Sequence, residues 1–197
     1  SRQLGKSTVS AAILDWALRF YPNNDIVILN FKKESALENL KKIKFINTQL
    51  PDFLKLDFAS KSDIKSYADY SNGSSVRTFY PTTVHTKDTI ARSLTAPILY
   101  IDEAAFITDM REVFGSAQPI LSTARAQAVK NNYPYMILVS STPNGVASKD
   151  GESWFYDRYQ NAIDTDKLFD EDNKWVYNCD EQIKDPSKNA FLKTRFH

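Results

Sequence analysis

Several residue types that build common functional sites are scarce in this chain of 197 residues. It has a single cysteine, Cys179, so no disulfide can form within it, and its two histidines, His85 and His197, are too widely separated to predict a metal cluster. We therefore expect a reducing, cytoplasmic setting. The longest apolar runs, 98–101 and 136–139, are far too short to cross a bilayer, and the opening residues lack a secretory leader pattern. These absences argue against a secreted or membrane protein.

An excess of one charge is also lacking. The chain carries 25 Lys and Arg against 24 Asp and Glu, with 42% hydrophobic and 13% aromatic residues. This balance argues against a disordered, collagenous or nucleic-acid-coating protein. The length suits one globular domain with a hydrophobic core. The pattern changes after Asn144-Gly145, and an acidic, polar run follows a last predicted helix, so we expect residues 1–150 to form the core domain and 151–197 its C-terminal edge.

Hydrophobic periodicity predicts alternating helices and strands. Large apolar residues at helical spacing, Val9, Ile13, Trp16 and Phe20, predict an amphipathic helix after Gly-Lys-Ser-Thr. Further helices are expected at 34–46, 118–130 and 154–163. Continuous apolar runs predict buried strands at 25–30, 98–101 and 136–141, and Asn72-Gly73 predicts a two-stranded antiparallel insertion within 64–80. Strands separated by helices indicate an α/β fold with a mostly parallel sheet.

The strongest local motif is Gly5-Lys6-Ser7-Thr8, at the start of the first predicted helix. In a phosphate-binding loop, backbone amides surround the phosphates, glycine permits close approach, and the helix N-terminus favours the anion. Lys6 would then reach the β and γ phosphates, and the Ser7 hydroxyl would hold Mg²⁺. Gly-Lys-Ser is also a common helix start, and the upstream glycine of the usual pattern would fall before Ser1. The motif alone therefore does not distinguish a phosphate-binding loop from an ordinary helix start.

Two adjacent acids, Asp102 and Glu103, directly follow the apolar strand 98–101. At the carboxyl edge of a parallel sheet, Asp102 would reach the magnesium shell, and Glu103 would lie beside the γ phosphate, where it can orient and deprotonate a water. Adjacent acids after a strand are often only a solvated turn. Their position downstream of a Gly-Lys-Ser loop favours nucleotide hydrolysis.

Small polar residues follow the apolar residues of the strand at 136–141, in the order Ser140, Ser141, Thr142, Pro143 and Asn144. Hydroxyls at such a strand end can detect whether the γ phosphate is present and shift the loop that carries them. Pro-Asn-Gly is itself strong turn chemistry. Spacing alone leaves a sensor and a simple turn equally open.

Taken in order, these motifs resemble the large terminase subunits of tailed bacteriophages, in particular the T4-like group. Residues 1–8 are similar to that group's variant phosphate loop, in which an arginine, here Arg2, sits early. Residues 100–107 resemble its Walker B strand with the stretch that follows, and residues 141–145 resemble its coupling motif. The segments 72–74 and 89–93 extend the resemblance over most of the chain.

The resemblance implies a P-loop NTPase of the additional-strand type, with three layers and helices on both faces of a mostly parallel sheet. Residues 1–150 would be the ATPase core without its N-terminal strand, the chain starting inside its own phosphate loop, and 151–197 would lead toward a nuclease domain that this chain lacks. Nucleotide binding is assigned to Ser1, Arg2, Gln3, Leu4, Gly5, Lys6, Ser7 and Thr8.

The resemblance also assigns individual roles. Ser7 and Asp102 would hold Mg²⁺, Glu103 would be the catalytic carboxylate, and Arg2 would contact the phosphates in its own subunit. Arg92 would act on the nucleotide of a neighbouring subunit, although a solvated or helix-capping arginine is the alternative for it. Coupling would fall to Ser141, Thr142, Pro143 and Asn144.

The implied reaction is ATP hydrolysis that drives double-stranded DNA into a procapsid. The implied partners are the portal protein, the small terminase subunit and further copies of the chain in a ring, in the host cytoplasm and transiently docked on the procapsid. The lysines around the helix at 34–46 are typical of a solvated face and do not by themselves support DNA contact. The acids at 157, 164, 166 and 170 lie in a helix and a polar loop, so we expect no nuclease activity.

Two other functions stay open. One is a different additional-strand ATPase such as a helicase, although Arg2 and the Ser-Thr-Pro-Asn-Gly segment fit a terminase better. The other is a non-enzymatic interaction module in which the phosphate loop is a relic.

Overall fold

The structure is a computed structural model that describes residues 5–59, 65–81, 96–142, 150–164 and 192–193. Its helices are α1 (Lys6–Phe20), α2 (Lys33–Gln49), α4 (Met110–Lys130) and α5 (Asp150–Gln160), with short 3-10 turns η1 (Asp52–Leu54) and η2 (Ala104–Phe106). The strands are β1 (Asp25–Asn30), β2 (Tyr67–Asp69), β3 (Ser75–Phe79), β4 (Ile98–Asp102), β5 (Met136–Ser140) and the small pair β6 (Ile163–Asp164) and β7 (Leu192–Lys193). Among the described helices, none combines the length and apolar character that a bilayer crossing requires.

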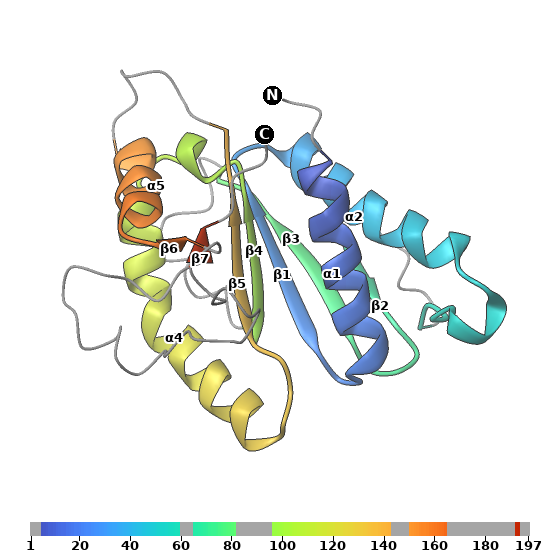
Figure 1. Ribbon diagram of the computed structural model, residues 1–197. Helices are drawn as coiled ribbons and strands as arrows, with labels where there is room; N and C mark the ends of the chain where they lie inside the picture. Colours follow the sequence, from blue (N-terminus) through green and yellow to red (C-terminus); the bar gives the residue numbers. More distant parts are fainter. Residues whose placement is uncertain (1–4, 60–64, 82–95, 143–149, 165–191, 194–197) are drawn as a thin grey trace, which may run out of the picture.

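The central sheet has five strands in the order β2-β3-β1-β4-β5, and only the β2–β3 pair is antiparallel. Helices α1 and α2 lie on one face, and α4 and α5 lie on the other, which gives three layers (Figure 1). This confirms the predicted α/β architecture. The predicted antiparallel hairpin is present, but it is wrong to regard it as an insertion, because β3 pairs in parallel with β1 and belongs to the main sheet.

Alternating residues of the central strands supply two hydrophobic cores. Ile26 and Ile28 face the core of α1 and α2, whereas Val27 and Leu29 face the core of α4 and α5. Trp154 of α5 is buried in the second core beside Phe114, with ring centroids 5.0 Å apart. Residues after 150 therefore pack on the same core as those before it, and a boundary at 150 stays a prediction.

The buried face of α1 differs from the predicted one. Val9, Trp16 and Phe20 are 50%, 45% and 56% exposed, and the side chains that face the core are smaller on average. They are Ser10, Ala11, Leu14, Asp15, Ala17 and Leu18. Small residues on this face let α1 lie close to α2, and Asp15 is buried because Arg19 donates to both of its oxygens at 2.8 Å. The apolar spacing predicted the helix but not its inner face.

Helix α4 begins at Met110, well before the predicted start at Gln118. Pro119 lies inside the helix, where its ring removes a backbone donor and crowds the preceding turn. The helix continues through it because the first half packs Met110, Val113 and Phe114 into the core. Burial therefore outweighs the local preference against proline.

Candidate nucleotide-hydrolysis site

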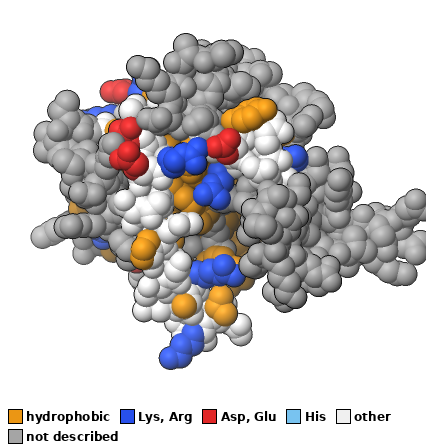
Figure 2. All heavy atoms as spheres, turned by 90° about the vertical axis from the view of Figure 1, so that its left-hand side faces the viewer, with side chains coloured by type: hydrophobic (Ala, Val, Ile, Leu, Met, Phe, Trp, Pro, Cys, Tyr) orange, Lys and Arg blue, Asp and Glu red, His pale blue; other side chains and the backbone are white. Residues whose placement is uncertain are grey.

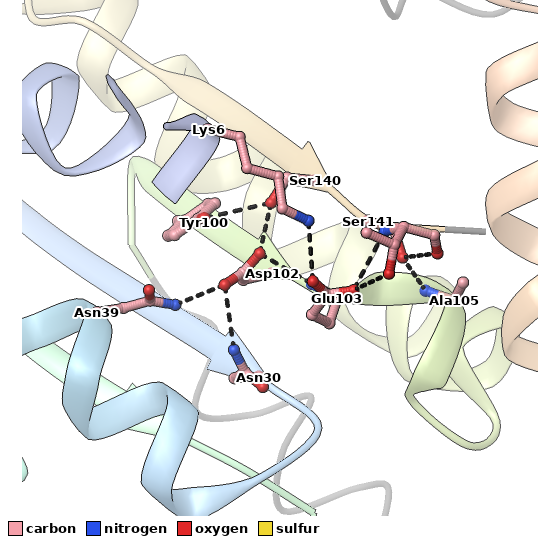
Figure 3. Close-up of polar contacts among 10 residues, drawn as sticks. Lys6, Asn30, Asn39, Tyr100, Asp102, Glu103, Ala105, Ser140 and Ser141 are labelled. Atoms are coloured by element: carbon pink, nitrogen blue, oxygen red, sulfur yellow. Dashed lines mark hydrogen bonds and ion pairs between the residues drawn. The ribbon is translucent and has the colours of Figure 1, made fainter. Parts of the chain in front are cut away.

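Three neighbouring parallel strands end together at one edge of the sheet, close to the start of α1. Asn30, Asp102 and Ser140 are the last residues of β1, β4 and β5, and they are direct register partners across the sheet. Parallel strands place their carboxyl ends at one edge, where ligands of open α/β sheets bind. The polar contacts described below are gathered at this edge (Figure 3).

Gly5 and Lys6 are the first described residues of the predicted phosphate-binding segment. Gly5 precedes α1 with φ of 72°, a left-handed conformation that glycine adopts without steric cost. Its carbonyl accepts the N–H groups of Thr8 and Val9 at 2.9 Å. The helix therefore starts at Lys6, whose Nζ donates to Oε1 of Glu103 at 2.9 Å from a partly buried position. Two motifs 97 residues apart in sequence thus meet in one ion pair.

Glu103 adopts an unusual backbone conformation. Directly after β4, its φ is 52° and its ψ is 45°, in the left-handed region that costs a non-glycine residue on the order of 1–3 kcal/mol. Oε2 accepts both the backbone N–H of Thr142 at 3.1 Å and its hydroxyl at 2.9 Å. Lys6 and Thr142 together therefore hold the two carboxylate oxygens of a residue whose backbone is strained.

These contacts set the proton affinity of Glu103. Burial raises the pKa of this carboxyl, but the hydrogen bonds from Lys6 and Thr142 and the positive charge of Lys6 together outweigh burial. The net pKa lies below the ordinary value of 4.5. Glu103 is therefore ionised at neutral pH.

Asp102 is buried and accepts hydrogen bonds on both oxygens. Oδ1 accepts from the hydroxyl of Ser140 at 2.6 Å and from the N–H of Glu103 at 3.1 Å. Oδ2 accepts from Nδ2 of Asn39 at 2.8 Å and from Nδ2 of Asn30 at 3.3 Å. Sequence reasoning missed both asparagines. Asn30 could have been noticed as a polar residue ending a buried strand, whereas nothing in the sequence of α2 links Asn39 to Asp102.

Further hydrogen bonds join the neighbours of Asp102 to the end of β5 and to the segment that follows it. Tyr100 Oη lies 3.2 Å from Ser140 Oγ, and burial together with the nearby charge of Asp102 raises the pKa of the phenol. The Ser141 hydroxyl accepts the N–H of Ala105 at 3.1 Å and donates to the Thr142 carbonyl at 3.0 Å. The end of β5 is therefore joined to η2, the turn that follows Glu103.

The structure brings Lys6, Asp102, Glu103, Ser141 and Thr142 together, as the predicted site requires. Gly5, Ser7 and Thr8 lie at the start of α1, with Ser7 partly buried. The remaining predicted site residues are outside the described residues. They are Ser1, Arg2, Gln3, Leu4, Arg92, Pro143 and Asn144.

The donor set suits a hard cation that is shared with a ligand. Asp102 has only neutral hydrogen-bond partners among the described residues, so its charge is not compensated. The described residues contain no group of three or more His, Cys, Asp or Glu that could hold a metal alone. Mg²⁺ is typically bound by one or two carboxylates together with substrate phosphates and waters. Asp102 fits that pattern.

Comparison with known proteins finds one matching family and several structures with a similar fold. Residues 1–193 match the family described as "Terminase large subunit, T4likevirus-type, N-terminal". Among solved structures, the large terminase ATPase domain of Thermus phage P74-26 aligns with a TM-score of 0.52 at 18% identity, over 97% of this chain and 72% of that one. A mutant of the same domain aligns with a TM-score of 0.51 at 17% identity, over 98% and 72%. These likenesses show the fold, a mostly parallel five-stranded sheet with helices on both faces. The match over nearly the whole sequence shows that the chain belongs to the T4-like family of phage terminase large subunits, as part of their N-terminal region.

Proposed function

We propose that this chain is the ATP-hydrolysing motor of a viral DNA-packaging terminase. The observation that carries the proposal is the convergence of Lys6, Asp102, Glu103 and Thr142 at the carboxyl edge of a parallel sheet. A phosphate-loop lysine, a cation-binding carboxylate and a second carboxylate held by a sensor residue are the parts that phosphoryl transfer to water needs. The family and the fold of its solved relatives support the same function.

Residues 1–8 would bind the nucleotide, with the amides before α1 around the phosphates and the Lys6 ammonium on the β and γ phosphates. Ser7 and Asp102 would hold Mg²⁺, which, when bound, neutralises phosphate charge and orients the γ phosphate. Lys6 now contacts Glu103. Phosphate oxygens compete for the same ammonium, so nucleotide binding would transfer Lys6 from Glu103 to the phosphates.

Glu103 would be the general base. Departure of Lys6 leaves Oε1 without its present partner, while Thr142 still holds Oε2 through two hydrogen bonds. The carboxylate therefore keeps its orientation while one oxygen becomes able to accept a proton from the attacking water. The same contact gives Thr142 a means to report the state of Glu103 to the coupling segment, which is proposed to comprise Ser141, Thr142, Pro143 and Asn144.

Arginines would complete the site. We assign Arg2 to the phosphates of its own subunit and Arg92 to the nucleotide of a neighbouring subunit, where a guanidinium can stabilise the charge of the transition state. A trans-acting arginine requires a homo-oligomer, and the proposed assembly is a ring on the portal protein. The small terminase subunit and double-stranded DNA would be the other partners, in the host cytoplasm and on the procapsid.

Contact with DNA would involve few charges per subunit. On the face formed by α4 and α5, acidic and basic side chains are interspersed in the described part (Figure 2), and Arg111 pairs there with Asp157 at 2.7 Å. A ring that grips the duplex with several subunits would add their weak contacts.

The first test is magnesium-dependent ATP hydrolysis, with and without linear duplex DNA. Lys6→Ala removes the phosphate ligand, and Glu103→Gln removes the base while retaining a similar shape. We expect both to abolish turnover, and Glu103→Gln to retain nucleotide binding. Lys55→Ala is the matched lysine control, because Lys55 is paired with exposed Asp52 on the surface and should retain full activity.

The outcomes separate the candidate functions. Turnover that survives Glu103→Gln, or wild-type protein that neither binds nor hydrolyses ATP, would contradict the proposal and favour a relic loop. Stimulation by blunt duplex DNA without strand separation supports a packaging motor. Strand separation in the same assay would identify a helicase instead.

A further inference from the structure

Asn39 and Asn30 direct their side-chain amides at the same oxygen of Asp102. Nδ2 of Asn39 lies 2.8 Å from Oδ2, and Nδ2 of Asn30 lies 3.3 Å from it (Figure 3). The two donors come from different layers of the fold, since Asn39 is on α2 and Asn30 ends β1. Both are buried, at 4% and 0% exposure. Asp102 therefore has a rigid pair of contacts on Oδ2 that no sequence motif indicated.

The orientation of the Asn30 amide is determined by its other end. Its Oδ1 accepts the backbone N–H of Lys32 at 3.2 Å. A backbone N–H can only donate, so the oxygen of this amide must face Lys32 and the NH₂ group must face Asp102. The Asn30 side chain therefore has only one amide orientation that satisfies both Lys32 and Asp102.

Asparagine at position 39 is costly unless it serves Asp102. Asn39 lies on the buried face of α2 beside Leu40, where asparagine has poor helix propensity and an apolar side chain would suit the core. An arginine or lysine would satisfy Asp102 but would also neutralise its charge. Amide donors satisfy Oδ2 and leave the full negative charge for a cation.

The other oxygen has a different kind of partner. Oδ1 accepts the backbone N–H of Glu103 and also the Ser140 hydroxyl, which can rotate and has Tyr100 Oη as another partner at 3.2 Å. Ser140 can therefore release Oδ1 without becoming unpaired, whereas the amides on Oδ2 have no comparable freedom. Oδ2 is therefore held by two side-chain amides, whereas Oδ1 keeps the Glu103 N–H and has one donor, the Ser140 hydroxyl, that can turn away and make room for another partner.

We propose that Asn39 and Asn30 are positioning residues that hold Oδ2 of Asp102, so that Oδ1 is presented to the magnesium ion or to a water on it. This inference rests on the proposed function of the site. Neither asparagine touches the nucleotide or the cation in this proposal. They act through Asp102, as the outer partners of metal ligands commonly do.

The test is a magnesium titration of the binding of a non-hydrolysable ATP analogue, which needs no turnover. Asn39→Leu keeps a similar volume and removes the donor. We expect it to raise the half-saturating Mg²⁺ concentration by about tenfold or more, with analogue affinity in EDTA unchanged. Asn30→Ala should act in the same direction by a smaller factor, because its contact is longer.

Asn47→Leu is the matched control. Asn47 lies on the same helix, is also 4% exposed, and bonds to Leu56 and Arg19 rather than to Asp102. We expect Asn47→Leu to lower thermal stability and to leave the magnesium titration unchanged. Identical titrations for wild type, Asn39→Leu and Asn47→Leu would overturn the proposal, since Asn39 would then be structural only.

Other outcomes are also decisive. Equal loss of analogue affinity in magnesium and in EDTA would overturn the proposal, because it would indicate a distorted pocket rather than a displaced carboxylate. If Asn39→Leu does not fold, Asn30→Ala decides by the same titration. Wild-type protein that shows no magnesium-dependent analogue binding would overturn the proposed function itself, and this inference with it.

Discussion

At the scale of single residues, Glu103 combines a strained backbone with a carboxylate whose two oxygens both accept hydrogen bonds. Its φ of 52° is unfavourable for a glutamate, yet both carboxylate oxygens have partners in Lys6 and Thr142. Strained residues persist only where the surrounding structure fixes them, and they are concentrated at functional sites. The contacts that fix Glu103 come from the two segments that the proposed mechanism joins.

The pKa of Glu103 gives a prediction about stability. Because this pKa is lower in the folded protein than the ordinary 4.5, folding favours the ionised form, and the stabilisation is present above that value and lost as the pH falls through the folded pKa. We expect wild type to be more stable than Glu103→Gln at neutral pH, and this difference to shrink below about pH 4.5. Denaturant unfolding at a series of pH values measures it. A difference independent of pH would contradict the assigned contacts.

At the scale of elements, buried parallel strands were the most predictable. The runs at 26–29 and 98–101 are continuously apolar because both faces of β1 and β4 are covered, and the observed bounds of these strands agree closely with the predicted ones. The start of α4 was not predictable from local preference, because tertiary burial stabilises a helix through Pro119. The pairing of β3 with β1 joins distant segments, so no local pattern could indicate it.

The turn between β2 and β3 offers a matched pair of glycine substitutions. Gly73 has φ of 82°, and an added Cβ would lie 2.1 Å from Oδ1 of Asn23. We expect Gly73→Ala to lower the free energy of unfolding by about 1–3 kcal/mol. Gly115, inside α4, has open space around it, so Gly115→Ala should raise stability by about 0.5–1 kcal/mol. Chemical denaturation compares the two, and equal effects would refute this account of the turn.

At the scale of the whole molecule, the three-layer arrangement decides which apolar residues are buried. In α1 the bulkiest side chains face outward, and Ala11, Leu14 and Ala17 face the sheet and α2. Helical periodicity cannot distinguish these two stripes, because each recurs at the same spacing. Only the close approach of α1 and α2, which favours small residues, selects the inner face.

The observed inner face of α1 predicts that the cost of truncating a side chain depends more on its burial than on its size. Leu14 is fully buried, so Leu14→Ala should lower the free energy of unfolding by about 2–5 kcal/mol. Phe20 is larger but 56% exposed, and Phe20→Ala should cost less than about 1 kcal/mol. Thermal and denaturant unfolding of both variants provide the comparison. A larger cost for Phe20→Ala would mean that the outward face of α1 is packed in the protein.

Some residues of the candidate site could be predicted from the sequence, and others could not. Lys6, Asp102, Glu103 and Thr142 belong to local motifs in which residue type and strand position already indicate chemistry. Asn39 carries no such signal, because its role depends on the contact of a helix with the end of a distant strand. Motifs therefore indicated the groups that are proposed to react, and the fold was needed to find the groups that contact them.

The register of the sheet has a further consequence for how this protein can fail. Asn30, Asp102 and Ser140 are aligned only because β1, β4 and β5 pair in one register. A slip of one residue turns every side chain of a strand to the opposite face. Because these strands are apolar on both faces, a slipped chain could still bury much of its hydrophobic surface. Such a product would pass a test of compactness although Asn30, Asp102 and Ser140 were no longer aligned, so a test of the proposed magnesium-dependent nucleotide binding would measure the fidelity of folding better than solubility does.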